Sequence, residues 1–355
     1  MPYYSTGATG TMATLIQAME ADTRLRNART LDLLSSKGAV GTTDMIEMNW
    51  NVIRTDSTSV GATFATGGSD QTVGDAVRAT LPIGGFKIYH QFSVSRVDMK
   101  DAARRGSEQL RRLFQMNLSA GVLSIRKQIN SFLFSGTGVA GTGGIIGFNS
   151  VTDHTAAYAG IPYAIYSTAA GGGWDAIRDR DGATTTARAL SRSLLYTLDT
   201  NRDIYEATYD SIVMHPQTLQ KYTELFDTSS ATIPAVQVQV PLGYARDLAP
   251  GTKLYNGVPI TSDASAPLNQ MLFFDSNYVK LVSMDLSNAD QGSLTSMGQK
   301  DNFETIASAD LGGLKLNVAL IPQSNPGTIQ FQIFAICQLK VENRKYVQVL
   351  KELSL

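Results

Sequence analysis

Few side chains of this 355-residue chain are arranged for acid–base or metal chemistry. Its three histidines, His90, His154 and His215, are far apart in the sequence, and the patterns H-E-x-x-H and G-x-S-x-G do not occur. No two carboxylates stand in a recognisable general acid–base frame. We interpret His90 as an interface or packing residue, not a ligand, and His215 as a turn residue. The sequence therefore predicts a protein that is not an enzyme and that has neither cofactor nor metal ion.

A glycine cluster from Gly136 to Gly147 is the one motif that could be a cofactor loop. It contains G-x-G-x-x-G, in which backbone N–H groups can cradle the phosphates of a dinucleotide. That fingerprint needs a strand before it and a helix after it, whereas here a predicted helix precedes the cluster and Ile145-Ile146 follow it. We interpret the cluster as a helix-to-sheet loop. A soluble metabolic enzyme that uses this loop is the alternative from another class.

Composition narrows the function further. Charged residues make up 17% of the chain, where about 25% is usual, and the net charge is −1. A surface poor in charge suits a protein that covers much of its outside with copies of itself, and it argues against strong, delocalised nucleic-acid binding. The single cysteine, Cys337, excludes an internal disulfide. No apolar run approaches the ~20 residues of a membrane span, so we expect no membrane partner.

A long helix predicted over residues 101–135 is the element around which the rest is organised. Its apolar residues recur at steps of three and four, which is the period of one helix face. Gly106 and Gly121 lie inside it and cost about 1 kcal/mol each relative to alanine, so packing must hold the helix. The predicted packing residues are Leu110, Leu113, Phe114, Leu118, Val122, Ile125 and Ile129.

Two alternating segments, residues 46–52 and 86–94, predict strands with one apolar face each. We interpret them as the arms of a long two-stranded ribbon, with a turn near Gly67-Gly68. A ribbon of this length is barely stable alone in water, so we expect it to lie on a neighbouring subunit. The predicted contacts between subunits are Ile46, Met48, Trp50, Val52, Phe86, Ile88 and Phe92.

The remaining segments predict helices and strands without a sustained βαβ rhythm, and hence an α+β fold. The main expectations are a helix within residues 11–36, a buried strand at 212–214 leading into a helix that starts at Pro216, a hairpin at Asn256-Gly257, and a closing hairpin formed by strands at 329–341 and 346–350.

This order of parts resembles the major capsid proteins of tailed bacteriophages (Caudoviricetes), which have the Hong Kong 97 fold. Residues 209–226 look like the strand–Pro–helix of the family's axial domain. Residues 257–274 look like its next strands, and residues 331–350, with Arg344 near the turn, look like its closing strands. The likeness extends over nearly the whole chain from about residue 10.

The resemblance implies a division of the chain and a function. Residues 1–44 would be an N-terminal arm, 45–98 the extended E-loop, 99–185 a peripheral domain with the spine helix, 186–285 the axial domain, and 286–355 strands shared by both domains. The implied function is a structural, self-assembling major capsid protein that forms pentamers and hexamers of an icosahedral virion shell. The shell would enclose double-stranded DNA without sequence-specific binding, after assembly in the host cytoplasm.

The implied partners are copies of the chain itself, a portal protein and, in some members of the family, decoration proteins. Only about 44 residues precede the ribbon, so we expect a separate scaffolding protein. Some members cross-link a ribbon lysine to an asparagine. Residues 55–77 contain no lysine, and Lys87 is the only candidate before Lys100, so we expect no cross-links. Encapsulins share the fold but enclose protein cargo, and an encapsulin-like shell is the nearer alternative.

Overall fold

The computed structural model describes residues 28–53, 76–83, 87–105, 107–138, 144–153, 156–161, 174, 176–178, 188–227, 253–285, 304–321 and 327–354. These residues form helices and strands that are segregated along most of the chain, and the predicted α+β class is confirmed. They belong to two compact units. The first contains residues 1–48, 82–147 and 280–340, and the second contains residues 49–81, 148–279 and 341–355.

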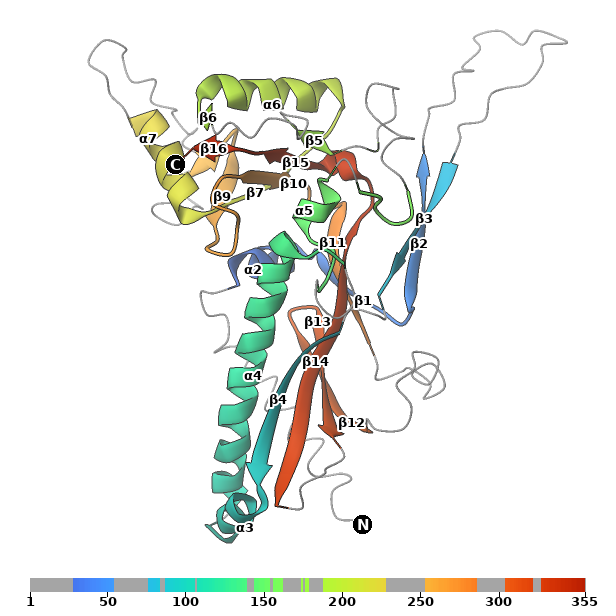
Figure 1. The fold of residues 1–355 in the computed structure, drawn as a ribbon, viewed down its shortest axis with the longest axis vertical. Helices are drawn as coiled ribbons and strands as arrows, with labels where there is room; N and C mark the ends of the chain where they lie inside the picture. The colour runs from blue at the N-terminus through green and yellow to red at the C-terminus, as the bar shows by residue number, and fades with distance from the viewer. Residues whose placement is uncertain are drawn as a thin grey trace, which may run out of the picture. The chain divides into compact units, whose positions relative to one another are not determined.

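The first unit combines the long helix with a sheet (Figure 1). Its helices are α2 (Arg29–Ser36), α3 (Arg96–Arg105) and α4 (Ser107–Ser135). Its strands run in the order β1 (Val40–Thr43), β11 (Val279–Met284), β14 (Thr328–Val341), β13 (Leu314–Ile321) and β12 (Glu304–Leu311), with β4 (Lys87–Ser95) also paired to β14. Strands β12 and β13 are joined by Gly312 and Gly313, whose φ angles of 62° and 89° suit a two-residue hairpin turn.

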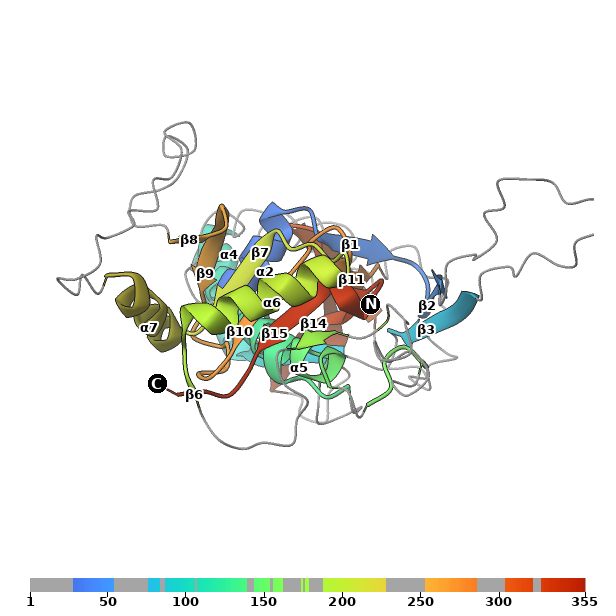
Figure 2. The ribbon, with the colours of Figure 1, turned by 90° about the horizontal axis from the view of Figure 1, so that it is seen from above.

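The second unit is built on another sheet, with strands in the order β5 (Ile177–Arg178), β15 (Val347–Leu350), β10 (Met271–Phe274), β7 (Ser211–Met214), β9 (Val258–Ser262) and β8 (Leu254–Tyr255). Further elements are α5 (Phe148–Val151), α6 (Arg192–Ile204), α7 (Pro216–Asp227), the 3-10 turn η3 (Arg344–Tyr346) and the parallel pair β6 (Arg188–Ala189) and β16 (Leu353–Ser354). Helix α6 lies over β15 and β10 (Figure 2).

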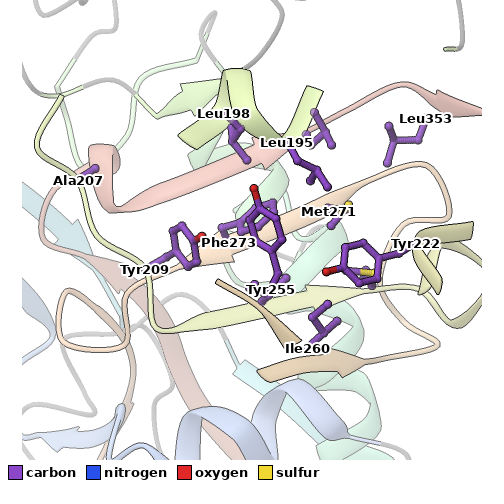
Figure 3. Packing of buried hydrophobic residues seen from close by; sticks show 13 residues of the cluster. Leu195, Leu198, Ala207, Tyr209, Tyr222, Tyr255, Ile260, Met271, Phe273 and Leu353 are labelled. Carbon is purple, nitrogen blue, oxygen red and sulfur yellow. The ribbon is translucent and has the colours of Figure 1, made fainter. Parts of the chain in front are cut away.

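The core of the second unit lies beneath α6. Leu195 and Leu198 of the helix pack with Ile212 of β7 and Phe273 of β10, and the ring of Tyr209 meets that of Phe273 edge to face (Figure 3). Two sequence predictions in this unit are confirmed. A buried strand runs into a helix that starts at Pro216, and residues 256–257 form the predicted hairpin turn.

The residues described within the long helix predicted over 101–135 are all helical. Residues 101–105 belong to α3 and residues 107–135 form α4, while residue 106 lies outside the described residues. Of the helix predicted within residues 11–36, only α2 lies inside the described part of the chain.

The pairing of the strands differs from the prediction. The segment 87–95 is a strand, as predicted, but it pairs with β14 and not with β2 (Glu47–Ile53), whose partner is β3 (Ala76–Pro82). The predicted closing hairpin is also wrong, because β14 and β15 belong to different sheets. Residues 148–279 fall in the second compact unit, where β5 pairs with β15.

Candidate functional site: the ribbon and the long helix

The ribbon strand β2 has one face covered and one face exposed. Met48 and Val52 are buried, whereas the alternating residues Asn49 and Asn51 are exposed. Trp50 is half-buried, and its Nε1 donates a hydrogen bond to the carbonyl of Glu342 at 2.9 Å. The strand is therefore anchored by its own chain.

Three members of the predicted set of contacts between subunits, Met48, Val52 and Ile88, are buried within the single chain. Among the described members, Ile46 remains exposed at 38%, while Trp50 and Phe92 are half-buried. Phe86 lies outside the described residues.

Met45, which precedes Ile46, is 67% exposed and was missed by the sequence reasoning. The signal was its position directly before the alternating segment. Met45 and Ile46 lie directly before β2 and form an exposed apolar pair, called the step below. Both residues belong to the first unit. An exposed pair of large apolar residues is a candidate contact for another molecule.

Strand β4 carries two of the predicted residues into the sheet of the first unit. The ring of Phe92 stacks on Phe331 of β14 with centroids 5.3 Å apart. Lys87 donates from Nζ to Oε1 of Gln332 at 2.8 Å and lies 4.3 Å from the centroid of the Phe334 ring. Burial lowers the pKa of Lys87 to about 8. The cross-linking candidate of the sequence analysis is thus a sheet residue of β4.

The long helix α4 presents a buried face. Leu118, Val122, Ile125 and Ile129 are fully buried. Leu110, Leu113 and Phe114 lie in α4, but their side chains are outside the described set.

The contacts around Gly121 explain why α4 has a glycine at this position. A Cβ atom at this position would lie 2.6 Å from Cδ1 of Ile333 and 2.9 Å from Cδ2 of His90. The glycine therefore lets the sheet approach the helix backbone closely. His90 packs against the helix, as the sequence analysis interpreted it.

Helix α2 is anchored on α4 by polar residues that sequence reasoning missed. The residue before α2, Ala28, provides no side-chain cap, and the N–H of Leu31 instead donates to Oδ1 of the buried Asn130 at 3.0 Å. Arg126 forms an ion pair with Asp32 of α2. In the sequence Arg126 falls on the charged side of the helix, and nothing in the spacing distinguishes it from solvated neighbours.

The glycine cluster packs against the end of α4. The N–H of Gly136 donates to the carbonyl of Phe132, and the N–H of Gly147 donates to the carbonyl of Gly136. A Cβ atom at Gly147 would lie 2.5 Å from the Phe132 carbonyl oxygen, and one at Gly144 would lie 2.5 Å from Cδ2 of the Phe132 ring. These glycines allow the loop backbone to lie close to the end of α4, where a larger side chain would not fit. Two of their N–H groups donate hydrogen bonds to carbonyls.

Arg344 is fully buried in the second unit. Its guanidinium donates to the carbonyls of Val151 at 2.6 Å and Ala156 at 3.4 Å, and also to that of Asp153. One side chain thus fixes the segment that follows α5. Its position near the turn was visible in the sequence, but its three acceptors were not.

No group of His, Cys, Asp and Glu residues that could hold a metal ion occurs within the described residues. In the same part of the chain, no helix is both long and apolar enough to cross a membrane. Cys337 is buried in β14, and burial raises the pKa of its thiol to about 12.

Comparison with known proteins finds similarity at the level of structure. No family model matches the sequence, and no curated protein matches it either. The capsid subunit of cyanophage A-1(L) is similar over 93% of both chains, with a TM-score of 0.72 and 20% sequence identity. The capsid of a native GTA particle is similar over 93% of this chain and 92% of that one, with a TM-score of 0.56 and 15% identity. The chain therefore has the fold of phage capsid proteins.

Proposed function

We propose that this chain, which resembles tailed-phage major capsid proteins in fold, is a structural subunit of an icosahedral shell. It self-assembles into pentamers and hexamers and encloses double-stranded DNA without sequence-specific binding. The observation that carries the proposal is the agreement with the cyanophage capsid subunit over 93% of both chains. A match of that extent includes the elements of both units, and not only one common motif.

In this proposal the first unit is the peripheral domain and the second contains the axial domain. Residues 1–44 are the N-terminal arm. The E-loop lies within residues 45–98, with β2 and β3 as its paired base, because β4 belongs to the sheet of the first unit. Beyond residue 286, β12 to β14 contribute to the peripheral domain, and β15 and β16 to the axial domain.

The physical properties of the chain support a structural role. Its charged fraction of 17% limits the cost of removing charge from water at many contacts between copies. Many small contacts suffice in a shell, because each subunit is held by several neighbours at once. We further propose that the shell is that of a virion, assembled in the host cytoplasm with a separate scaffolding protein, a portal protein and, if present, decoration proteins.

Electron microscopy of the purified full-length protein, followed by analysis of its contents, tests the proposal. We expect closed shells of uniform size that contain double-stranded DNA when isolated from producing cells. Shells with a co-purified protein cargo would support the encapsulin-like alternative. A small, uniform oligomer that binds nucleotide would overturn the proposal in favour of an enzyme.

The step formed by Met45 and Ile46 offers a test of how copies meet. We propose that another subunit covers it, so Met45→Ser with Ile46→Ser should reduce shell yield and leave the thermal unfolding of the isolated chain nearly unchanged. Thr42→Ser, also at an exposed position, is the matched control. Normal shell yield in the double variant would show that this step is not a contact.

A further inference from the structure

Two tyrosines mark the places where the chain leaves and re-enters the second unit. Residues 280–340 belong to the first unit, so the chain leaves the second unit after Val279 and returns at Val341. Tyr278 stands just before the departure, and Tyr346, at the end of η3, stands just after the return. Both belong to the second unit, 68 positions apart in sequence.

The backbone holds the two tyrosines together. The N–H of Glu342 donates to the carbonyl of Tyr278 at 2.9 Å, and the N–H of Asp275 donates to the carbonyl of Tyr346 at 3.2 Å. Each bond joins the departing segment to the returning one. The two side chains therefore start from positions that are already fixed.

The two phenol rings are stacked face to face. Their centroids are 3.6 Å apart and their planes differ by 4°. Aromatic pairs normally prefer offset or edge-to-face contacts at 4.5–7 Å, because the faces of two rings repel each other. A nearby cation offsets part of that repulsion here, because Nζ of Lys345 lies 5.2 Å from the centroid of the Tyr346 ring.

The stacking also brings reactive carbon atoms together. Because the centroids are 3.6 Å apart and the planes are almost parallel, ring carbons of one tyrosine lie against ring carbons of the other. Oxidised phenols couple through the ring carbons next to the hydroxyl. We propose that Tyr278 and Tyr346 are an oxidative modification site, which one-electron oxidants convert into an intrachain dityrosine.

The reaction is balanced as a two-electron oxidation. Each phenol gives one electron to the oxidant and its hydroxyl proton to solvent, which leaves two phenoxyl radicals. A carbon–carbon bond forms between one Cε of each ring. The hydrogens on these two carbons then move to the oxygens and restore two phenols. The chain loses two electrons and two protons, and a peroxide or persulfate is reduced. Fixed neighbouring rings favour this route, because the second radical need not diffuse to the first.

The bond would covalently join the two points at which the chain leaves and re-enters the second unit. It would close residues 278–346 into a loop and restrict the unfolded chain, as a disulfide does. The single cysteine is buried and cannot supply such a link within one chain. This inference concerns the isolated chain and does not depend on the proposed shell.

Photo-oxidation of the purified full-length protein with a ruthenium tris-bipyridyl complex and persulfate tests the inference. The expected product is lighter by two hydrogen atoms, fluoresces as dityrosine and yields one cross-linked peptide containing positions 278 and 346. Its yield should not depend on protein concentration, and its thermal midpoint should exceed that of the unoxidised protein. Tyr278→Phe keeps the ring but removes the phenol, and it should lose the cross-linked peptide.

Tyr222→Phe is the matched control. Tyr222 also contacts a tyrosine, Tyr255, but with centroids 6.4 Å apart and planes at 86°, so its removal should leave the product unchanged. The same cross-linked peptide should be absent from Tyr346→Phe, and circular dichroism should show that every variant is folded. Oxidation of other tyrosines without a 278–346 peptide, or dityrosine only between chains, would overturn the inference.

Discussion

The buried guanidinium of Arg344 binds the end of α5 and the irregular chain that follows it. Its planar fork reaches the carbonyl of Val151, the last residue of α5, and those of Asp153 and Ala156 after it. An ammonium group could approach one or two of these carbonyls but could not match the fork. Replacement by lysine would therefore leave buried carbonyls without donors.

Arg344→Lys should lower the free energy of unfolding by roughly 2–3 kcal/mol, because each buried group left unsatisfied costs about 1–3 kcal/mol. Urea denaturation of the isolated chain measures the change. The same replacement at the exposed Arg78 is the control and should have little effect. An equal loss in both variants would refute the role assigned to the fork.

At the residue scale, sequence patterns predicted apolar burial better than polar contacts. The three-and-four spacing placed Leu118, Val122 and Ile125 on one face, and these side chains are buried. The same pattern assigned Arg126 to the opposite, solvated face, although it is 7% exposed and pairs with Asp32. Periodicity indicates which residues avoid water, but this partly buried ion pair depends on a partner 94 positions away that no local pattern reveals.

Among the elements, α2 shows how strongly a short helix depends on its neighbour. Eight residues are too few for a stable isolated helix, and its first turn has no cap of its own. Asn130, near the C-terminal end of α4, supplies the missing acceptor. The packing of α2 on α4 therefore also satisfies the buried amide of Asn130.

Asn130→Ala should destabilise α2 by about 1–2 kcal/mol, the usual cost of losing a helix cap. Hydrogen exchange of the amides of residues 31–36 should become faster, while the amides of β7 should keep their protection. Gln128→Ala, on the exposed side of the same helix, is the control. Unchanged exchange in α2 would mean that its start does not need the amide.

Element types were predicted well from the sequence, and their partners were predicted poorly. The strand at residues 87–95 has a clear alternation, but alternation defines only a face and says nothing about which strand pairs with it. Strand β14 offered nine paired positions and a stacked Phe92–Phe331 contact. The Asn256-Gly257 hairpin was predicted correctly because its partner strand follows two residues later and its turn residues favour positive φ.

For the whole molecule, partly buried tyrosines set how stability depends on alkaline pH. Burial raises the pKa of Tyr209, Tyr222 and Tyr346 to about 12 in each case, from an ordinary value of 10.0. In the unfolded chain these phenols ionise near the ordinary value. The folded state therefore binds more protons than the unfolded state between these two values, and it loses stability as the pH rises through that window.

We expect the free energy of unfolding to fall steadily between about pH 10 and pH 12. Urea titrations at several pH values in this window provide the measurement. Tyr222→Phe should reduce the slope, because the variant lacks one of the phenols that resist ionisation when folded. A flat profile, or an unchanged slope in the variant, would contradict this account.

The positions of β14 and β15 have a consequence for protein synthesis. Strand β14 is an interior strand of one sheet and β15 of the other, and both come from residues 328–350. Neither sheet can be completed on the ribosome until residues 328–350 have emerged. The two sheets therefore wait for the same stretch of chain, and neither can complete its hydrogen-bond ladder before the other during synthesis.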